Sequence, residues 1–149
     1  EEFWDQALED WDFIFCKNSE IMTWRYFQNP DYYHFITVRS EESLVGFLIY
    51  KLVSDESGTN LIIADFLFLK KGVSALKSCI RYIKLKGLSI DAKSILLWCD
   101  SGSPYFDIFK KSGFVHQETI PIIAFKDEFF EQLKYLKKIH FVMGDSDNI

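Results

Sequence analysis

Apolar side chains near the N-terminus recur at the spacing of an amphipathic helix, with Asp and Glu between them. The pattern covers residues 1 to about 15 and consists of Phe3, Trp4, Ala7, Leu8, Trp11 and Phe15. A second, short helix is predicted next, with Ser19 as its N-cap and Glu20 in its first turn. It ends at Asn29, because the residue before Pro30 disfavours helical backbone. Two helices are therefore expected ahead of the first strand.

The next segments alternate between β-rich runs and turn residues. Residues 33–39 and 44–53 favour strands, and the Ser-Glu-Glu-Ser sequence at 40–43 joins them as a hairpin. Turn-forming residues at 54–60 lead into residues 61–69, which are apolar on both faces of a strand. Such a strand is expected to be buried on both sides.

The middle of the chain contains a strand, a helix and a second strand. After residues 70–72, the apolar positions from Val73 to Ile83 have helical spacing, and Gly87 is expected to end this helix. Residues 94–99 form another fully apolar strand. Because a strand–helix–strand unit returns the chain in the same direction, this strand and residues 61–69 are predicted to lie parallel in one sheet.

Shorter elements are predicted in the last third of the chain. Pro104 suits the first position of a short helix that ends at Gly113. The remaining predicted elements are strands at 114–116, 120–125 and 138–143, a helix at 127–136 and a polar tail at 144–149. The expected fold class is α/β (α+β), with residues 1–149 in a single domain.

Composition argues against several classes of protein. Charged residues make up 26% of the 149 residues, as in ordinary soluble domains, and the 17% aromatic content predicts a core built largely from rings. The net charge of −5 and the scatter of Lys and Arg among acids argue against nucleic-acid binding. No apolar run reaches the roughly 18 residues needed to span a bilayer, so no membrane association is expected.

The cysteines and histidines are too dispersed for disulfide or metal chemistry. Cys16, Cys79 and Cys99 form no C-x-x-C pair, which speaks against a disulfide framework and a zinc site and favours a reducing cytoplasm. The three histidines lack metal-ligand spacing, so no metal is expected. The chain begins with Glu1 rather than Met, which indicates a fragment or one half of a larger chain.

Three short segments carry a family likeness. Phe-Lys-Lys-Ser-Gly-Phe at 109–114 is similar to the helix-ending Tyr-x-x-x-Gly-Phe of the GNAT superfamily of N-acyltransferases, and the order of predicted elements also resembles that family over nearly the whole chain. Trp-Arg-Tyr-Phe-Gln-Asn-Pro at 24–30 and Gly-Asp-Ser-Asp at 144–147 resemble the second half of tandem-GNAT proteins associated with polysaccharide and cell-surface biosynthesis. The likeness implies a mixed, mostly antiparallel sheet with a central parallel strand pair and helices on both faces.

The resemblance implies acetyl-CoA or another acyl-CoA as the cofactor, bound in the gap between the two parallel strands. In the family a basic, Gly-rich turn after the first of these strands holds the pyrophosphate at a helix N-terminus. Here the turn is Lys70-Lys71-Gly72, which has one glycine and lacks the family's spacing. A coenzyme site at these residues and an ordinary turn with solvated lysines both stay open.

The short helix departs from the family pattern as well. Family members often place a Tyr general acid where Phe109 stands, and Phe cannot donate a proton. The family's Asn near the start of this helix falls at Gly102, which Ser101 and Ser103 flank as candidate cofactor-binding residues. Tyr105 is the candidate catalytic acid in place of the missing Tyr, and a buried packing residue is the alternative.

Asp65 is the candidate general base, because it interrupts an apolar strand in which burial would raise its pKa. A buried carboxylate needs a partner, so the alternative is an Asp bonded to backbone or paired with Arg25. Trp24 and Arg25 form a candidate sugar-stacking platform for substrate, unless this helix only packs on the sheet. Asp145 and Asp147 are candidate substrate contacts, and a solvated tail is the alternative.

Two functions are consistent with these features. The first is an active acyl-CoA-dependent N-acetyltransferase that acts on an amine such as an amino sugar, with Asp65 assisting. The second is a degenerate GNAT-like domain that binds substrate or packs on a catalytic half, and the missing glycines and Phe109 favour it. The expected partners are therefore a small-molecule amine or a second GNAT-like domain. A plain protein-interaction domain stays open as a third function.

Overall fold

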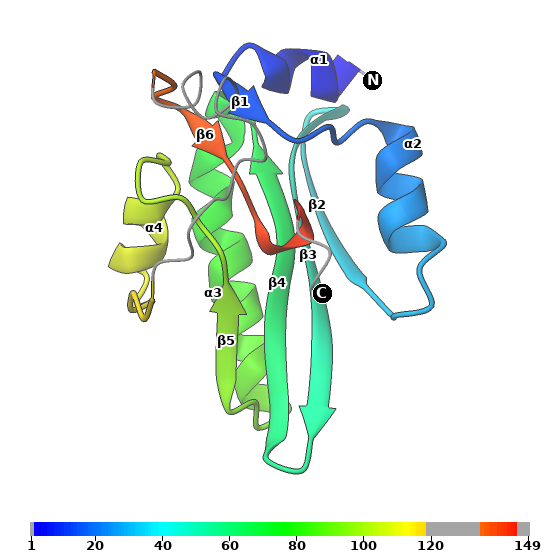
Figure 1. Cartoon of the computed structure of the whole chain (residues 1–149), viewed down its shortest axis with the longest axis vertical. Helices are drawn as coiled ribbons and strands as arrows, with labels where there is room; N and C mark the ends of the chain where they lie inside the picture. The colour runs from blue at the N-terminus through cyan, green and yellow to red at the C-terminus, as the bar shows by residue number, and fades with distance from the viewer. Residues whose placement is uncertain (1, 119–134, 146–149) are drawn as a thin grey trace.

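A computed structural model describes residues 2–118 and 135–145 of the chain (Figure 1). The helices are α1 (Glu2–Leu8), α2 (Ser19–Met22), α3 (Val73–Ser89) and α4 (Phe106–Lys111), with a π-helical turn η1 (Thr23–Phe27) and the 3-10 turns η2 (Lys70–Gly72) and η3 (Met143–Asp145). The strands are β1 (Phe13–Ile14), β2 (His34–Ser40), β3 (Ser43–Asp55), β4 (Gly58–Phe68), β5 (Ser94–Leu97) and β6 (Ile139–His140).

The main sheet has the order β2-β3-β4-β5 and is mixed, as the sequence predicts. Strands β2, β3 and β4 are antiparallel neighbours, while β4 and β5 run parallel and are joined through α3. Both the predicted hairpin and the predicted parallel pair are therefore confirmed. The buried character of β4 is confirmed too, since every residue from Ile63 to Phe68 is buried.

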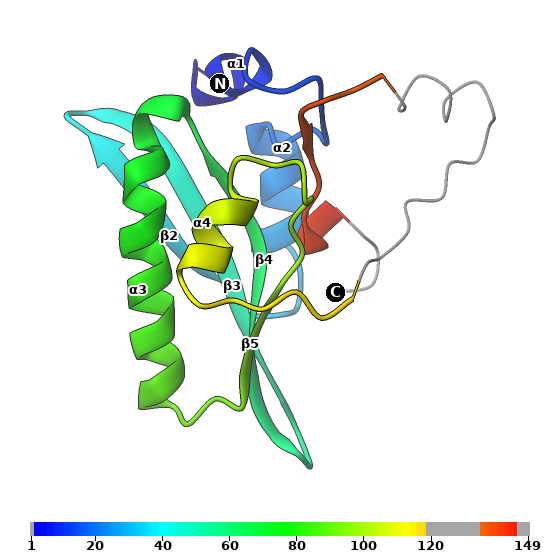
Figure 2. The same cartoon turned by 90° about the vertical axis from the view of Figure 1, so that its left-hand side faces the viewer.

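Helices cover both faces of this sheet (Figure 2). Each face has its own apolar cluster. The face under α3 and α4 packs a cluster that includes Leu48, Ile63, Phe66, Phe68, Ile80 and Phe109. The face under α1 and η1 packs a cluster that includes Ala7, Tyr26, Ile49, Ala64 and Leu67. The flanking helices and the aromatic core expected from the sequence are both present.

Strand β4 carries a bulge at Ala64. Ile49 pairs with Asp65 and Tyr50 pairs with Ile63, so one extra residue of β4 lies between these two pairs. The bulge reverses the alternation of side chains: odd-numbered residues face α3 before it, and even-numbered residues do so after it. The parallel pairing with β5 also stops at Ile63, which leaves the second half of β4 unpaired by β5.

The predicted helix over residues 1–15 is wrong beyond Leu8. Residues Phe13–Ile14 form β1, which pairs in parallel with β6. Asp12 explains the change, because its carboxylate accepts hydrogen bonds from the backbone N–H groups of Lys137 (2.8 Å) and Lys138 (3.0 Å). The chain therefore leaves the helix to meet a segment that is distant in sequence.

Two helix ends also differ from the predicted ones. Asn18, rather than Ser19, caps α2, since its side-chain oxygen accepts a hydrogen bond from the N–H of Ile21 at 2.9 Å. Helix α3 continues through Gly87 to Ser89, and Asp91 takes the left-handed conformation after it, with a φ of 53°. The stop at Asn29-Pro30 agrees with the structure, in which η1 ends at Phe27.

The segments after residue 94 are shorter than predicted. Strand β5 ends at Leu97 and is only partly buried, because it is the edge of the described sheet. Pro104 lies in a turn, and α4 begins at Phe106. Residues 114–116 form no strand: Phe114 packs on Phe109 with ring centroids 5.3 Å apart, whereas Val115 is exposed. In place of a strand over 138–143 the chain forms β6 and then η3.

Some predictions fall where the structure gives no description. The strand at 120–125, most of the helix at 127–136 and the end of the tail, including Asp147, lie outside the described residues. Within residues 2–118 and 135–145, no helix has the length and apolar character needed to cross a membrane.

Candidate functional site

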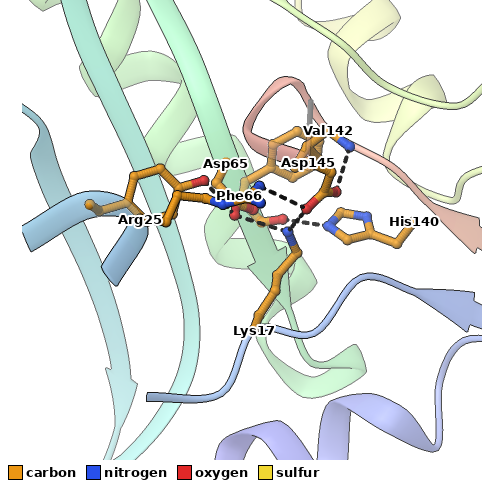
Figure 3. Close-up of polar contacts among 8 residues, drawn as sticks. Lys17, Arg25, Asp65, Phe66, His140, Val142 and Asp145 are labelled. Carbon is orange, nitrogen blue, oxygen red and sulfur yellow. Dashed lines mark hydrogen bonds and ion pairs between the residues drawn. The ribbon is translucent and has the colours of Figure 1, made fainter. Parts of the chain in front are cut away.

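A buried ionic cluster lies at the bulge of β4 (Figure 3). Asp65 is 1% exposed, and its Oδ2 accepts hydrogen bonds from Lys17 Nζ at 2.9 Å and from the Tyr26 hydroxyl at 2.9 Å. Lys17 Nζ also donates to Asp145 Oδ1 at 2.8 Å. Arg25 reaches the same Asp145 oxygen at 3.8 Å. Two acids and two basic residues thus balance their charges, with the side chains of Lys17, Asp65 and Asp145 buried and Arg25 partly exposed.

The cluster is held by backbone as well as by side chains. Asp145 Oδ2 accepts a hydrogen bond from the N–H of Val142 at 3.0 Å, which closes the η3 turn. Gly144 packs so tightly that a Cβ at this position would clash with the Tyr26 hydroxyl and meet the carbonyl oxygen of Ala64 at 3.0 Å. Only glycine fits between the turn and the bulge. The cluster therefore joins the N-terminal loop, β4 and the C-terminal segment.

Burial and neighbouring charges shift the pKa values in the cluster. Desolvation raises the pKa of Asp65, and Asp145 adds to this effect, while Lys17 and the hydrogen bonds of Lys17 and Tyr26 oppose it. Burial by itself lowers the pKa of Lys17, but attraction to Asp65 and Asp145 outweighs burial and raises it. Lys17 is therefore the stably charged member between the two carboxylates.

The surroundings of Asp65 limit what this residue does chemically. Its Oδ2 is occupied by two donors, and its Oδ1 is buried and accepts no hydrogen bond from the described residues. A general base must contact the proton that it removes, directly or through one water. In the observed conformation Asp65 is sealed under Lys17 and Tyr26. Its role as a base stays a prediction that requires this seal to open.

The partner of Asp65 differs from the one considered from the sequence, which was Arg25 or the backbone. Asp65 does have a cationic partner, but that partner is Lys17, whereas Arg25 pairs with Asp145. Lys17 was not singled out from the sequence. The available signal was Lys17 itself, which directly follows the apolar run Phe-Ile-Phe-Cys at 13–16. A lysine that is buried together with such a run needs an acidic partner.

The unpaired half of β4 is closed by side chains. The Tyr105 hydroxyl donates to the carbonyl oxygen of Phe68 at 2.6 Å and accepts from the Phe68 N–H at 3.0 Å. His140 Nε2 lies 2.7 Å from the carbonyl oxygen of Phe66 and must carry the proton there, because a carbonyl only accepts. Both side chains are 1% exposed. They occupy the backbone groups of β4 that β5 leaves free after the bulge.

Tyr105 and His140 are electrically neutral in this environment. Burial raises the pKa of Tyr105, while the hydrogen bond with Phe68 opposes that shift. Burial, together with the nearby charge of Lys17, lowers the pKa of His140 to about 3. The ring of Trp11 packs on both residues, with centroids 5.4 Å from Tyr105 and 4.8 Å from His140. Tyr105 is therefore buried and packed among other rings, as the alternative to a catalytic role expected. It is also hydrogen-bonded to the backbone of Phe68.

The two serines near the start of α4 have different environments. Ser103 is buried, and its hydroxyl accepts from the N–H of Tyr105 at 3.2 Å. Ser101 is exposed. Gly102 donates its N–H to the carboxylate of Asp100 at 2.8 Å. The structure thus does not bring both serines to one surface.

The lysine turn after β4 is stabilised by its own contacts. Gly72 donates its N–H to the Leu69 carbonyl oxygen at 2.7 Å, and a Cβ on Gly72 would clash with the carbonyl oxygen of Val45. Lys70 forms an ion pair with Asp10 at 2.6 Å, and Lys71 is exposed. Gly72 is therefore needed for close packing of the turn on β3, and its N–H is already used.

Trp24 and Arg25, the two candidate substrate-binding residues, differ in their environments. Trp24 is 60% exposed and lines an open groove of about 480 Å³ with Ser19, Glu20, Ile21, Thr23 and Gln28. The Arg25 guanidinium lies 5.9 Å from the Trp24 ring centroid while it contacts buried Asp145. The side chain of Asp145 is only 2% exposed, and Arg25 contacts both this carboxylate and the Trp24 ring that lines the groove.

Comparison with solved structures identifies the fold. A ribosomal-protein-alanine N-acetyltransferase from Brucella melitensis biovar Abortus 2308 superposes with a TM-score of 0.59 at 13% identity, over 83% of this chain and 89% of that one. A putative acetyl transferase from Pyrococcus furiosus gives 0.53 at 16% identity, over 80% and 88%. The chain has the GNAT acetyltransferase fold.

A third GNAT structure adds information about that protein's ligand. It is an aminoglycoside acetyltransferase from an uncultured soil metagenomic sample in complex with sisomicin, with a TM-score of 0.53 at 11% identity over 83% of each chain. No protein-family model and no curated protein sequence matches this chain. At such low identities the structural likeness establishes the fold and leaves the chemistry of this chain to its own residues.

The first prediction concerns Lys17. Replacing Lys17 by Met leaves buried Asp65 without a cation and Asp145 with only Arg25 at 3.8 Å, and we expect a loss of about 3–5 kcal/mol in the free energy of unfolding. Lys70→Met is the matched control: it breaks an ion pair whose lysine is 76% exposed, and we expect it to cost less than about 1 kcal/mol. Urea denaturation followed by tryptophan fluorescence measures both. Equal effects would contradict the proposed importance of the buried cluster.

The second prediction concerns pH. Unfolded His140 takes up a proton below its ordinary pKa of 6.5, whereas folded His140, with a pKa of about 3, does not. The unfolded state therefore binds more protons in this window, and His140 makes the protein less stable as the pH falls from about 6.5 toward 3. The slope reaches about 1.4 kcal/mol per pH unit.

His140→Gln tests this because a Gln amide still donates to the Phe66 carbonyl without titrating. Urea denaturation across this pH range should show a shallower loss of stability in His140→Gln than in the unmodified chain. Parallel pH profiles for His140→Gln and the unmodified chain would refute the assignment.

Proposed function

We propose that this chain is a GNAT-fold, acetyltransferase-like domain that binds a substrate or a second domain and does not itself transfer an acetyl group. The observation that carries this proposal is the closure of β4 after its bulge. The backbone groups of Phe66 and Phe68 are hydrogen-bonded to His140 and Tyr105, in the gap where the family resemblance places acyl-CoA. A ligand that runs along this edge would have to displace both side chains.

Two further features support the same proposal. The N–H of Gly72 donates to Leu69, so the lysine turn lacks one of the free amides that a pyrophosphate requires. Asp65, the candidate base, is sealed by Lys17 and Tyr26. By these criteria the residues present do not fit a coenzyme A molecule in this conformation. We therefore derive no acetyl-transfer step for the chain.

Two observations favour the alternative of an active N-acetyltransferase. Strands β4 and β5 are parallel, and their pairing ends at the bulge. The family resemblance places acyl-CoA between two such strands. Burial also raises the pKa of Asp65, as a general base requires. In an active enzyme Tyr105 and His140 would first have to leave the β4 edge, and Lys17 would have to release Asp65.

The third prediction separates these two functions. We expect isothermal titration of the chain with acetyl-CoA to show no binding at millimolar ligand, because the β4 edge is already occupied. A thiol-release assay with acetyl-CoA and a panel of amines should likewise show no turnover. Binding in the micromolar range would exclude the closed-gap proposal. Turnover that is lost in Asp65→Asn, with binding retained, would establish the active alternative.

We further propose that the groove beside Trp24 is the substrate-binding surface and that its ligand is an amine-bearing saccharide. An exposed indole face suits stacking on a sugar ring, and Glu20, Thr23 and Gln28 supply hydrogen-bonding groups in the same groove. The sisomicin complex of a protein with this fold supports the choice of ligand class. The tandem arrangement that the sequence resemblance implies stays a prediction, which the coding sequence upstream of Glu1 tests.

The fourth prediction tests this groove. Sisomicin should bind with a dissociation constant that Trp24→Ala raises about tenfold, the equivalent of roughly 1.4 kcal/mol for a lost stacking contact. Glu20→Gln should weaken sisomicin, which carries amines, but leave trehalose, which carries none, unchanged. Nuclear magnetic resonance titration measures both ligands. Sisomicin binding that is indifferent to Trp24 would place the substrate elsewhere.

A further inference from the structure

Helix α3 presents a strongly basic outer surface on an acidic chain. Its 17 residues include four basic side chains, Lys77, Arg81, Lys84 and Lys86, and no acidic one. The whole chain has a net charge of −5. Positive charge is therefore concentrated on one helix, which creates a local field opposite to that of the molecule as a whole.

Three of these basic residues line a groove. It has a volume of about 320 Å³ and is lined by Lys77, Ile80, Arg81, Lys84, Leu85, Leu88 and Ser112. The far wall is fixed by Lys84, whose Nζ donates to the carbonyl oxygen of Ser112 just after α4, at 3.0 Å. Figure 2 shows α3 and α4 side by side on this face of the sheet.

The groove combines unpaired charge with exposed apolar surface. Leu85 is 57% exposed and Leu88 is 79% exposed, although the opposite side of α3 packs in the core. Lys77 and Arg81 form no ion pair with any described residue, in contrast to Lys51 and Lys70. Leu85 and Leu88 are neighbours at i and i+3 and line the same groove as these cations, so one ligand could contact both kinds of group.

We propose that this groove docks an acidic, amphipathic segment of a partner protein. Lys77, Arg81 and Lys84 follow one another at i, i+4 and i+7, so they form a row along one side of α3. Carboxylates at the same spacing on a partner helix would face this row, while apolar side chains of the partner cover Leu85 and Leu88. The charge complementarity selects an acidic partner, and the leucines select an amphipathic one.

The shape of the surface favours a peptide segment over an anionic membrane. The leucines line a hollow together with the basic groups, so an inserted side chain would contact both. A flat lipid surface would leave the hollow unfilled. The proposal is independent of acetyl transfer and of the Trp24 groove, because it involves other residues on the opposite face of the sheet.

The fifth prediction is tested with a fluorescein-labelled helical peptide on an alanine background, with Glu at i, i+4 and i+7 and Leu on the adjoining flank. Fluorescence anisotropy should show saturable binding that weakens as salt is raised. Arg81→Glu should weaken binding at least about tenfold, and Leu88→Ser should also weaken it. A peptide with Lys in place of Glu should instead prefer the Arg81→Glu chain.

Lys86→Glu is the matched control, because it makes the same charge change on the same helix outside the groove. It should leave peptide binding within about twofold of the unmodified chain. Lack of saturable binding, or an equal loss in Lys86→Glu, overturns the proposal. Cosedimentation with phosphatidylserine vesicles in the absence of peptide binding would assign the surface to lipid instead. Self-association that Arg81→Glu abolishes would assign it to a second copy of the chain.

Discussion

The structure depends on one buried interaction, the contact of the Lys17 ammonium with the carboxylates of Asp65 and Asp145. Its members come from the loop after β1, from the central strand β4 and from the turn η3, so a single cation fixes three segments at one point. The β1–β6 pair has only two residues in each strand and would hold the chain ends weakly by itself. Removing the cation would leave two like charges buried together, a cost much greater than the loss of an exposed ion pair.

The bulge at Ala64 determines where this interaction lies. It directs Asp65 to the face of β4 that meets Lys17 and Tyr26, and it coincides with the end of the β4–β5 pairing. Beyond this divergence, Tyr105 and His140 bond to the backbone of β4 that β5 leaves unpaired. The N–H of Phe68 is already bonded to the Tyr105 hydroxyl and cannot donate to a ligand at the same time. The proposal of a closed gap depends on this bond and on the position of both side chains against β4.

The middle of the fold follows from local sequence patterns, and the ends do not. Strand-like runs around a turn predicted the β2–β3 hairpin, and a helix between two apolar runs predicted the parallel pair β4–β5. Strand β1 was missed because its partner β6 is more than 120 residues away, and its apolar residues continue the helical spacing of α1. The burial of Asp65 was predictable from its apolar strand. Its partner Lys17 was not, since 48 residues and several elements separate the two.

The roles of structural anchor and general base place opposite demands on Asp65. An anchor gains stability from a close cation and from exclusion of water, and both are present at Lys17 and Tyr26. A base needs an approach route for its substrate and a carboxylate oxygen that is free to accept a proton. Oδ1 is free of hydrogen bonds from described residues, but it is buried. The raised pKa of Asp65 therefore reflects desolvation within a structural cluster as readily as preparation for catalysis, and only the accessibility of Oδ1 distinguishes the two.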